Sequence, residues 1–138
     1  MADQEMHQIG SVANAVGLSL RTIRHYEEVG VVVPSGRSAG GFRLYTDRDI
    51  DRLRLVKKMK PLDFTLEEVG DILHLLDALG GEPDDETRAS LGARLDMYAA
   101  LAAERCERRR EQLAAAIEST DTLTQAAREA RGVPLRRR

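Results

Sequence analysis

Apolar positions near the start of the chain recur with helical spacing and predict two short helices joined by a tight turn. The first pattern ends at Gly17, and Ser19 is a typical cap for a second helix, which ends near Gly30. The apolar positions of these helices are Ile9, Val12, Ala13, Val16, Leu20, Ile23 and Tyr26. Two helices of this length around a short turn have the layout of a helix-turn-helix, whose second helix lies in the major groove of DNA.

Two runs of β-branched or aromatic residues follow and predict a β-hairpin. The first run is the three valines at 31–33, which precede Pro34, and the second run is Phe-Arg-Leu-Tyr at 42–45. A segment rich in Gly and Ser at 35–41 separates them and is typical of a turn. A hairpin directly after a helix-turn-helix predicts a wing.

Capping residues predict two more helices. Thr46 precedes an acidic first turn, and Pro61 ends the helix that follows. Thr65 and Glu68 have the spacing of a capping box, and the helix that they begin ends near Gly80. The apolar positions of these two helices are Ile50, Leu53, Val56, Val69, Ile72, Leu73 and Leu76.

Residues 84–124 predict one long helix, because the segment has no proline and is rich in Ala, Leu, Glu and Arg. About 40 residues span roughly 60 Å as a helix, and a domain of about 80 residues cannot cover a helix of that length. Spacings of four and three residues along one face are typical of a coiled coil, so we expect a second copy to cover it, rather than a solvated single helix. The expected dimerisation positions are Leu95, Ala99, Ala102, Cys106, Leu113, Ala116 and Leu123.

The fold class is therefore predicted to be mainly α. Residues 1–80 form a winged helix-turn-helix domain, and residues 84–124 form a dimerisation helix. Residues 125–138 are expected to be a disordered basic tail, since they end in three arginines.

The formal net charge is −2, but the charges are arranged in blocks. Residues 19–60 hold ten Lys or Arg against five Asp or Glu, whereas residues 61–87 hold nine acidic residues and no Lys or Arg. This division favours one basic surface that binds an anion and acidic surfaces elsewhere that repel it.

The remaining composition excludes several classes. A single cysteine cannot form an internal disulfide or a multi-thiolate metal site, and the three histidines lack a familiar zinc-ligand spacing. No apolar run is long enough to span a membrane, and residues 1–10 lack the features of a signal peptide, so we expect a cytoplasmic, nucleoid-associated protein. No catalytic constellation or phosphate loop is present, so we expect that the protein is not an enzyme and has no cofactor.

Cations and hydroxyls gather on the second helix, on the wing and at the end of the third helix. Arginine can bind guanine edges or phosphates, and hydroxyls can bind phosphate oxygens. The lysines at 57–60 have an alternative role, because cations also interact favourably with a helix C-terminus. The candidate DNA-binding residues are Ser19, Arg21, Thr22, Arg24, His25, Tyr26, Arg37, Gly41, Phe42, Arg43, Tyr45, Lys58 and Lys60.

Several of these segments together resemble the N-terminal signature of MerR-type regulators. The matching segments, within residues 7–79, are Ile9-Gly10, the run Ser-Leu-Arg-Thr-Ile-Arg-His-Tyr-Glu at 19–27, Gly30, the run Gly-Phe-Arg-Leu-Tyr at 41–45 and the run Phe-Thr-Leu-Glu-Glu-Val at 64–69. The chain departs from the family pattern at His25, where a second Tyr is common, and at Asp63, where a Gly is common.

The resemblance implies a dimer joined by an antiparallel coiled coil. It also implies binding to a pseudo-palindrome in promoter DNA, whose spacer is bent and untwisted so that RNA polymerase engages both promoter elements. Smooth bending of such a site costs about 1–6 kcal/mol. By motif position, Arg21, Thr22, Arg24 and Tyr26 of the recognition helix and Arg43 and Tyr45 of the wing would contact DNA.

The effector is left open by the sequence. Cys106 alone cannot supply the paired thiolates of the family's metal sensors, and we expect no large drug-binding domain after the long helix. The alternatives are a small ligand at the dimer interface, a protein partner, or no effector. Cys106 lies near the middle of the long helix, where it could meet its own copy, but a small core-filling residue is the favoured interpretation over a redox disulfide.

Two other functions compete with promoter regulation. An excisionase-like architectural protein would bend DNA without regulating a promoter, and a coiled-coil adaptor would not bind DNA at all. The long helix and the extended match argue against the excisionase-like alternative. The adaptor alternative predicts that Arg24→Ala and Arg43→Ala leave every measurable activity intact.

Overall fold

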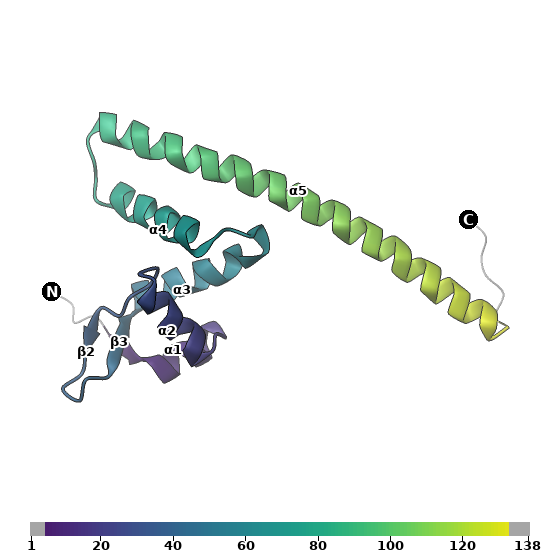
Figure 1. The fold of residues 1–138 in the computed structure, drawn as a ribbon, viewed down its shortest axis with the longest axis horizontal. Coiled ribbons are helices and arrows are strands. Elements are labelled where there is room, and N and C mark those ends of the chain that lie inside the picture. Colours follow the sequence, from purple (N-terminus) through teal and green to yellow (C-terminus); the bar gives the residue numbers. More distant parts are fainter. Residues whose placement is uncertain (1–4, 133–138) are drawn as a thin grey trace. The chain divides into compact units, whose positions relative to one another are not determined.

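Helices form most of the part of the chain that the structure describes, which is residues 5–132 of a computed structural model. A helical fold was predicted from the sequence and is confirmed (Figure 1). Contacts divide the chain into two units, of which one ends at Ala99 and the other begins at Ala100. The elements are β1 (Met6–Gln8), α1 (Ile9–Val16), α2 (Leu20–Glu28), β2 (Gly36–Arg37), β3 (Arg43–Thr46), α3 (Asp47–Met59), the 3-10 helix η1 (Lys60–Leu62), α4 (Leu66–Gly80) and α5 (Asp85–Ala130).

The predicted helix-turn-helix is present as α1 and α2. Gly17 ends α1 with a φ of 70°, and its N–H donates to the carbonyl of Ala13 over 2.9 Å. The Ser19 Oγ accepts a hydrogen bond from the Thr22 N–H over 3.1 Å and so caps α2. The positive φ of Gly17 favours glycine at this turn, whereas a Cβ added there would lie 2.6 Å from Lys57 Nζ, the flexible end of a side chain that can move aside.

The wing differs from its prediction in two ways. The valines at 31–33 do not form a strand, because Val31 and Val32 are buried in the core; the strand before the turn is only Gly36–Arg37. The short strand β1 was not predicted, and it pairs with β3 in antiparallel register, with His7 opposite Tyr45. The sheet therefore has the order β1-β3-β2, and β1 joins the start of α1 to the wing.

A single apolar core holds the helix-turn-helix, the base of the wing, α3 and α4 together. Its position explains the spacing of apolar residues in the sequence, since each helix turns one stripe inward. Burial of these side chains is the main source of stability for a domain of this size. The core consists of Val12, Val16, Ile23, Tyr26, Val31, Val32, Tyr45, Ile50, Leu53, Val56, Met59, Val69, Ile72 and Leu73.

The helix starts expected at Thr46 and Thr65 are present, and both have capping boxes, although the sequence predicted a capping box only for Thr65 and Glu68. Thr46 accepts from the Asp49 N–H at the start of α3, and Asp49 accepts from the Thr46 N–H in return. Thr65 and Glu68 make the same reciprocal pair at the start of α4. These caps fix where each helix begins and therefore how α3 and α4 meet the core.

Polar and aromatic contacts join the first turns of α5 to α4. The Asp71 carboxylate accepts hydrogen bonds from Arg94 Nη2 over 2.6 and 2.7 Å and from the Tyr98 hydroxyl over 2.6 Å. The Tyr98 ring packs edge-on against Phe64, with ring centroids 5.9 Å apart. The hydrogen bond from Tyr98, and then those from Arg94, lower the pKa of Asp71. We call Asp71, Arg94 and Tyr98 the α4–α5 clamp.

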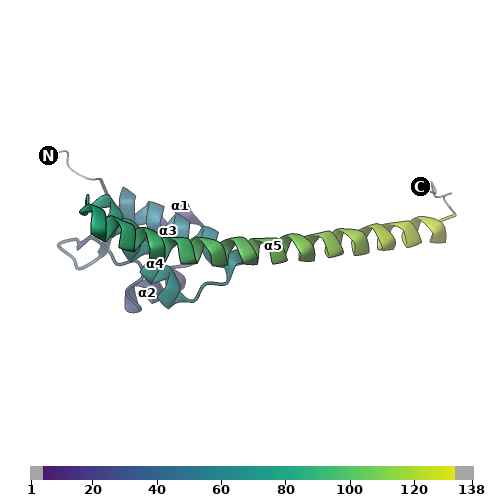
Figure 2. The ribbon, with the colours of Figure 1, turned by 90° about the horizontal axis from the view of Figure 1, so that it is seen from above.

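The long helix α5 is unbroken over 46 residues, as both ribbon views show (Figure 1 and Figure 2). The predicted end at residue 124 was wrong, because residues 125–130 are strong helix formers and Gly132, with a φ of 74°, is the first breaker after them. The tail prediction for 133–138 lies outside the described residues. No helix in the described part of the chain combines the length and the apolar character that a membrane span requires.

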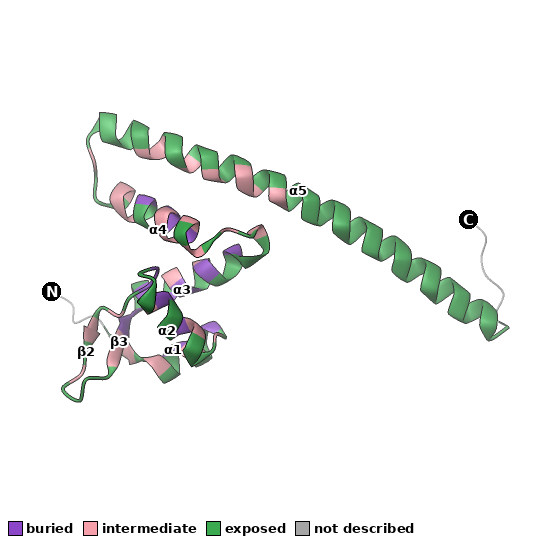
Figure 3. Ribbon diagram, viewed as in Figure 1, coloured by how far each residue is buried: buried purple, intermediate pink, exposed green. Residues whose placement is uncertain are grey.

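The second unit is coloured as exposed along most of its length (Figure 3), and this exposure includes large apolar residues. Leu113, Ile117 and Leu123 are 61%, 53% and 71% exposed. The spacing of four residues places Leu113 and Ile117 side by side on α5, whereas Leu123 lies about 120° from Ile117 around the helix. Of the predicted dimerisation positions, Leu95 and Ala102 are half-buried, and the others are exposed in the single chain, namely Ala99, Cys106, Leu113, Ala116 and Leu123.

Candidate nucleic-acid interface

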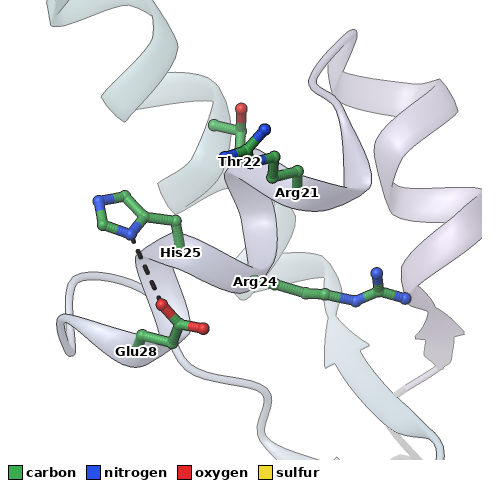
Figure 4. A pocket seen from close by; sticks show the side chains of 5 residues that line it. All are labelled: Arg21, Thr22, Arg24, His25 and Glu28. Carbon is green, nitrogen blue, oxygen red and sulfur yellow. Dashed lines mark ion pairs between the residues drawn. The ribbon is translucent and has the colours of Figure 1, made fainter.

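The outer face of α2 is a concave, open surface of about 600 Å³ with polar and cationic walls (Figure 4). Arg21, Arg24 and His25 are exposed on it, and neither arginine forms an ion pair with any residue that the structure describes. In Figure 4, Arg24 and His25 extend to opposite sides of the helix. The surface therefore offers two guanidinium groups and an imidazole, which can donate hydrogen bonds to base edges or to phosphates.

Local partners engage three of the predicted residues on α2 and at its cap, namely Ser19, Thr22 and His25. The Ser19 hydroxyl donates to Thr22 Oγ1 over 2.8 Å, so both side chains are engaged at the helix cap. His25 Nδ1 lies 3.7 Å from a carboxylate oxygen of Glu28, which orients the imidazole along the helix (Figure 4). Thr22 retains part of its surface, and its backbone lies at the start of the helix, where N–H groups can face an anion.

Tyr26 was predicted to contact DNA, but its side chain belongs to the core. Only 4% of its surface is exposed, and burial raises the pKa of its phenol. The reason is its position on the apolar stripe of α2, one turn after Ile23. Its role in the interface is to fix the helix against the core.

The wing arginines are bound to the recognition helix. Arg43 donates through Nε to the Glu27 carboxylate, and Arg37 donates through Nη2 to the other Glu27 oxygen over 3.0 Å. Arg37 Nη1 also donates to the Gly41 carbonyl over 3.2 Å. The hydrogen bond to Glu27 raises the pKa of Arg43 above its ordinary value. We call Glu27, Arg37 and Arg43 the wing triad.

Tyr45 is the second predicted contact that the structure does not support. The side chain is fully buried, and its hydroxyl has no hydrogen-bond partner among the described residues. Burial raises the pKa of this phenol. The alternation of side chains along β3 explains the result, because Arg43 and Tyr45 lie on one face of the strand and the tyrosine reaches the core.

The tip of the wing is closed by backbone bonds around Gly41. The Ser38 N–H donates to the Phe42 carbonyl, and the Gly41 N–H donates to the Ser38 carbonyl, each over 2.9 Å. Gly41 has a φ of 81°, a conformation that favours glycine. Phe42 is 64% exposed, so the tip presents an aromatic ring between glycines and cations.

The lysines at the end of α3 have separate roles. Lys57 Nζ donates to the carbonyls of Val16 and Gly17 over 2.9 and 3.2 Å, so it caps the C-terminus of α1. Lys58 and Lys60, the two lysines predicted to contact DNA, are exposed. Lys57 is exposed as well, but its ammonium group is already hydrogen-bonded to the end of α1, whereas those of Lys58 and Lys60 can bind a phosphate.

One group of potential metal ligands was not expected from the spacing of the histidines. Within the described residues, Glu5, His7 and Asp47 place ligand atoms within 4.8 Å of one another. His7 Nε2 lies 2.8 Å from the Asp47 carboxylate, and this hydrogen bond across β1 and the start of α3 is a sufficient reason for their proximity.

Cys106 is an exposed free thiol on α5.

Sequence reasoning did not identify Glu27 as a member of the interface. The available signal was its position as an acidic residue in the most basic block of the chain. Its two partners lie 10 and 16 residues away, and only the hairpin geometry brings them to it.

A three-stranded wing against a helix-turn-helix, with exposed arginines on the second helix, defines the winged helix-turn-helix class of fold. The sequence pattern of the family described as "MerR HTH family regulatory protein" matches residues 8–76, which is half of the chain. The chain therefore belongs to this family. The resemblance predicted from the motifs is confirmed.

Curated relatives match the same region. The chain is 42% identical over 67 residues to the HTH-type transcriptional activator TipA of Streptomyces coelicolor, a match that covers 49% of this chain and 26% of that protein. It is 37% identical over 70 residues to the mercuric resistance operon regulatory protein of Bacillus cereus, covering 51% of this chain and 53% of that protein. The matches thus span about half or less of these relatives.

Solved structures show the same fold over nearly the whole chain. HiNmlR, described as a MerR family regulator lacking the sensor domain and bound to promoter DNA, superposes with a TM-score of 0.70. The alignment covers 94% of this chain and 97% of that one, at 19% identity. MtaN, the N-terminal part of a Bacillus subtilis multidrug transporter activator, matches with a TM-score of 0.51 at 26% identity, over 86% of this chain and 97% of that one. The architectural alternative is not favoured, since these relatives are transcriptional regulators.

Proposed function

We propose that the protein is a homodimeric transcription regulator that binds promoter DNA through α2 and the wing. The observation that carries this proposal is the exposed face of α2, where Arg21, Arg24 and His25 have no structural task in the core. Family membership supports it, because relatives with this domain are named as transcriptional activators and regulators. Such a protein acts where promoter DNA is, in the cytoplasm at the nucleoid.

The division of labour follows from the contacts of each residue. Arg21 and Arg24 are free of ion pairs with the described residues and can reach base edges in the major groove. Lys58 and Lys60 are exposed and suit phosphates on the flanking backbone. Phe42 and Gly41 at the wing tip allow the backbone and a flat ring to approach the duplex closely.

The dimer is proposed from the second unit. Leu113, Ile117 and Leu123 expose more than half of their surface, and a helix with such side chains is stabilised when a second helix covers them. Two copies would set two recognition helices on one face of a pseudo-palindromic site. A bent and untwisted spacer would then let RNA polymerase engage both promoter elements, as the family resemblance implies. A small ligand at the dimer interface or a protein partner is the candidate effector, and a regulator without an effector is the third alternative.

Binding to selected DNA tests the proposal. Sites would be obtained by genome-wide mapping, and the affinity of the full chain would be measured by fluorescence anisotropy on a selected duplex and on a duplex of mixed sequence. Arg24→Ala is expected to lose about 1–3 kcal/mol on the selected duplex and less on the mixed one, because base contacts carry specificity.

The matched control is Arg54→Ala. Arg54 is half-exposed on α3 and pairs with Asp51 over 3.4 Å, and it lines a hollow between α1 and α3 rather than the face of α2. The control should keep the wild-type affinity for both duplexes. Equal losses for Arg24→Ala on both duplexes would contradict the base-reading role, and a wild-type chain that ignores DNA at low salt would contradict the function itself.

A further inference from the structure

The wing triad joins three elements through one carboxylate. Glu27 lies in the last turn of α2, Arg37 lies in β2 and Arg43 lies in β3. Glu27 is only 19% exposed at its side chain, and both of its oxygens accept from a guanidinium group. The two arginines and the carboxylate together carry one net positive charge, so half of the cationic charge of the wing is balanced inside the protein.

A balanced cation attracts phosphate less strongly than a free one. Non-specific affinity for DNA comes almost entirely from cations that displace counterions from phosphates. Arg37 and Arg43 therefore contribute less to non-specific binding than their number suggests. The same contacts hold the wing at a fixed angle to the recognition helix, so they favour the one arrangement in which both elements fit the duplex.

We propose that Glu27 is a specificity-determining positioning residue. By holding Arg37 and Arg43 it orients the wing on α2 and withholds their charge from DNA of arbitrary sequence. The inference rests on the proposed function, since it concerns how the same surface discriminates between sites. The raised pKa of Arg43 agrees with a guanidinium held by a carboxylate.

The Glu27→Gln variant tests the role of the charge. An amide of the same shape can still accept a hydrogen bond, but it no longer neutralises an arginine. The affinity of the full chain for a labelled duplex of mixed sequence would be measured by anisotropy between about 50 and 200 mM KCl. Each arginine that reaches a phosphate steepens the slope of log affinity against log salt by about 0.9, so the expected increase is about 1–2 for each subunit.

The affinities of the wild type and of Glu27→Gln for mixed-sequence DNA should diverge as the salt concentration is lowered. Since the electrostatic gain vanishes near 1 M salt, a slope steeper by about 1 corresponds to about a tenfold gain on mixed-sequence DNA at 0.1 M. Affinity for a selected site should rise less or fall, because the wing is no longer held in place. The ratio of specific to non-specific affinity should therefore fall, by about tenfold if the affinity for the selected site is unchanged and by more if that affinity falls.

Two further variants make the result decisive. Asp51→Asn is the control, because it changes the net charge as much as Glu27→Gln does. It also releases an arginine, since Asp51 pairs with Arg54, but this pair lies on α3. The slope of log affinity against log salt for Asp51→Asn should match that of the wild type. Adding Arg37→Gln to the Glu27→Gln chain should lower the slope again by about 0.9.

A slope for Glu27→Gln equal to that of Asp51→Asn would overturn the inference. So would a uniform loss of affinity on both duplexes with an unchanged slope, which is the signature of a purely structural contact. The proposed function fails separately, if the wild-type chain binds neither duplex.

Discussion

Replacing Tyr45 by phenylalanine is expected to stabilise the protein. The tyrosine side chain is fully buried at the base of the wing, and its hydroxyl has no hydrogen-bond partner among the described residues. The burial that raises the pKa of this phenol is the same desolvation that makes an unpaired polar group costly. Phenylalanine keeps the ring that fills the core and removes only the hydroxyl.

The magnitude follows from the cost of an unsatisfied buried group. That cost is about 1–3 kcal/mol, and deleting one oxygen leaves a void too small to offset most of it. The free energy of unfolding should therefore rise by about 1 kcal/mol or more. For a domain of this size, each kcal/mol corresponds to an increase in Tm of about 4–8 °C.

Two assays on the same variant check the reasoning. Urea unfolding followed by circular dichroism gives the change in stability from the transition midpoint, provided that the slope with denaturant is unchanged. Anisotropy on a selected duplex should show wild-type affinity, because a buried hydroxyl does not reach DNA. A loss of stability would show that the hydroxyl has a partner, and a loss of affinity at unchanged stability would restore the DNA contact that the sequence motif implied.

Two further predictions concern α5. Asp71→Asn should remove about 1 kcal/mol at neutral pH, since it weakens the α4–α5 clamp that includes Arg94 and Tyr98. Because the pKa of Asp71 is lowered in the folded chain, the carboxylate stabilises the fold above its ordinary pKa of 3.8, and this contribution disappears as the pH falls below that value. Urea unfolding between about pH 6 and 3 should therefore show a difference between wild type and variant that shrinks on acidification, and a constant difference would refute the assignment. Replacing Leu113 and Ile117 together by glutamate should convert the dimer to a monomer in sedimentation velocity while the circular dichroism spectrum stays helical; a dimer that persists would show that this face is not the interface.

Local signals in the sequence were sufficient for the helices. The caps at Ser19, Thr46 and Thr65 act within three residues of the helix start, so they can be recognised without tertiary information. The end of α5 was misplaced because no capping residue marks residue 124.

The sheet was harder to predict, because strand pairing is a long-range property. β1 has only three residues, and its partner lies about 40 residues away, so no periodicity reveals it. The three valines have high β-propensity, yet core burial at Val31 and Val32 decided their conformation instead.

The interface shows the same division between local and long-range information. Helical spacing identified the exposed arginines of α2, since residues off the apolar stripe face outward. Spacing alone could not separate a tyrosine that packs inward from one that reaches DNA, and the structure places Tyr26 and Tyr45 in the core. The pairing of Glu27 with the wing depends on the hairpin and could not be deduced from the sequence.

Two copies of the chain are proposed to read one DNA site with their α2 helices. Sedimentation velocity of the full chain with a selected duplex measures the number of chains bound, because it gives the mass of the complex. We expect two chains on each duplex and a dimer in the absence of DNA at micromolar concentration. A single chain on each duplex, or no complex at low salt, would show that the protein does not bind DNA as a dimer.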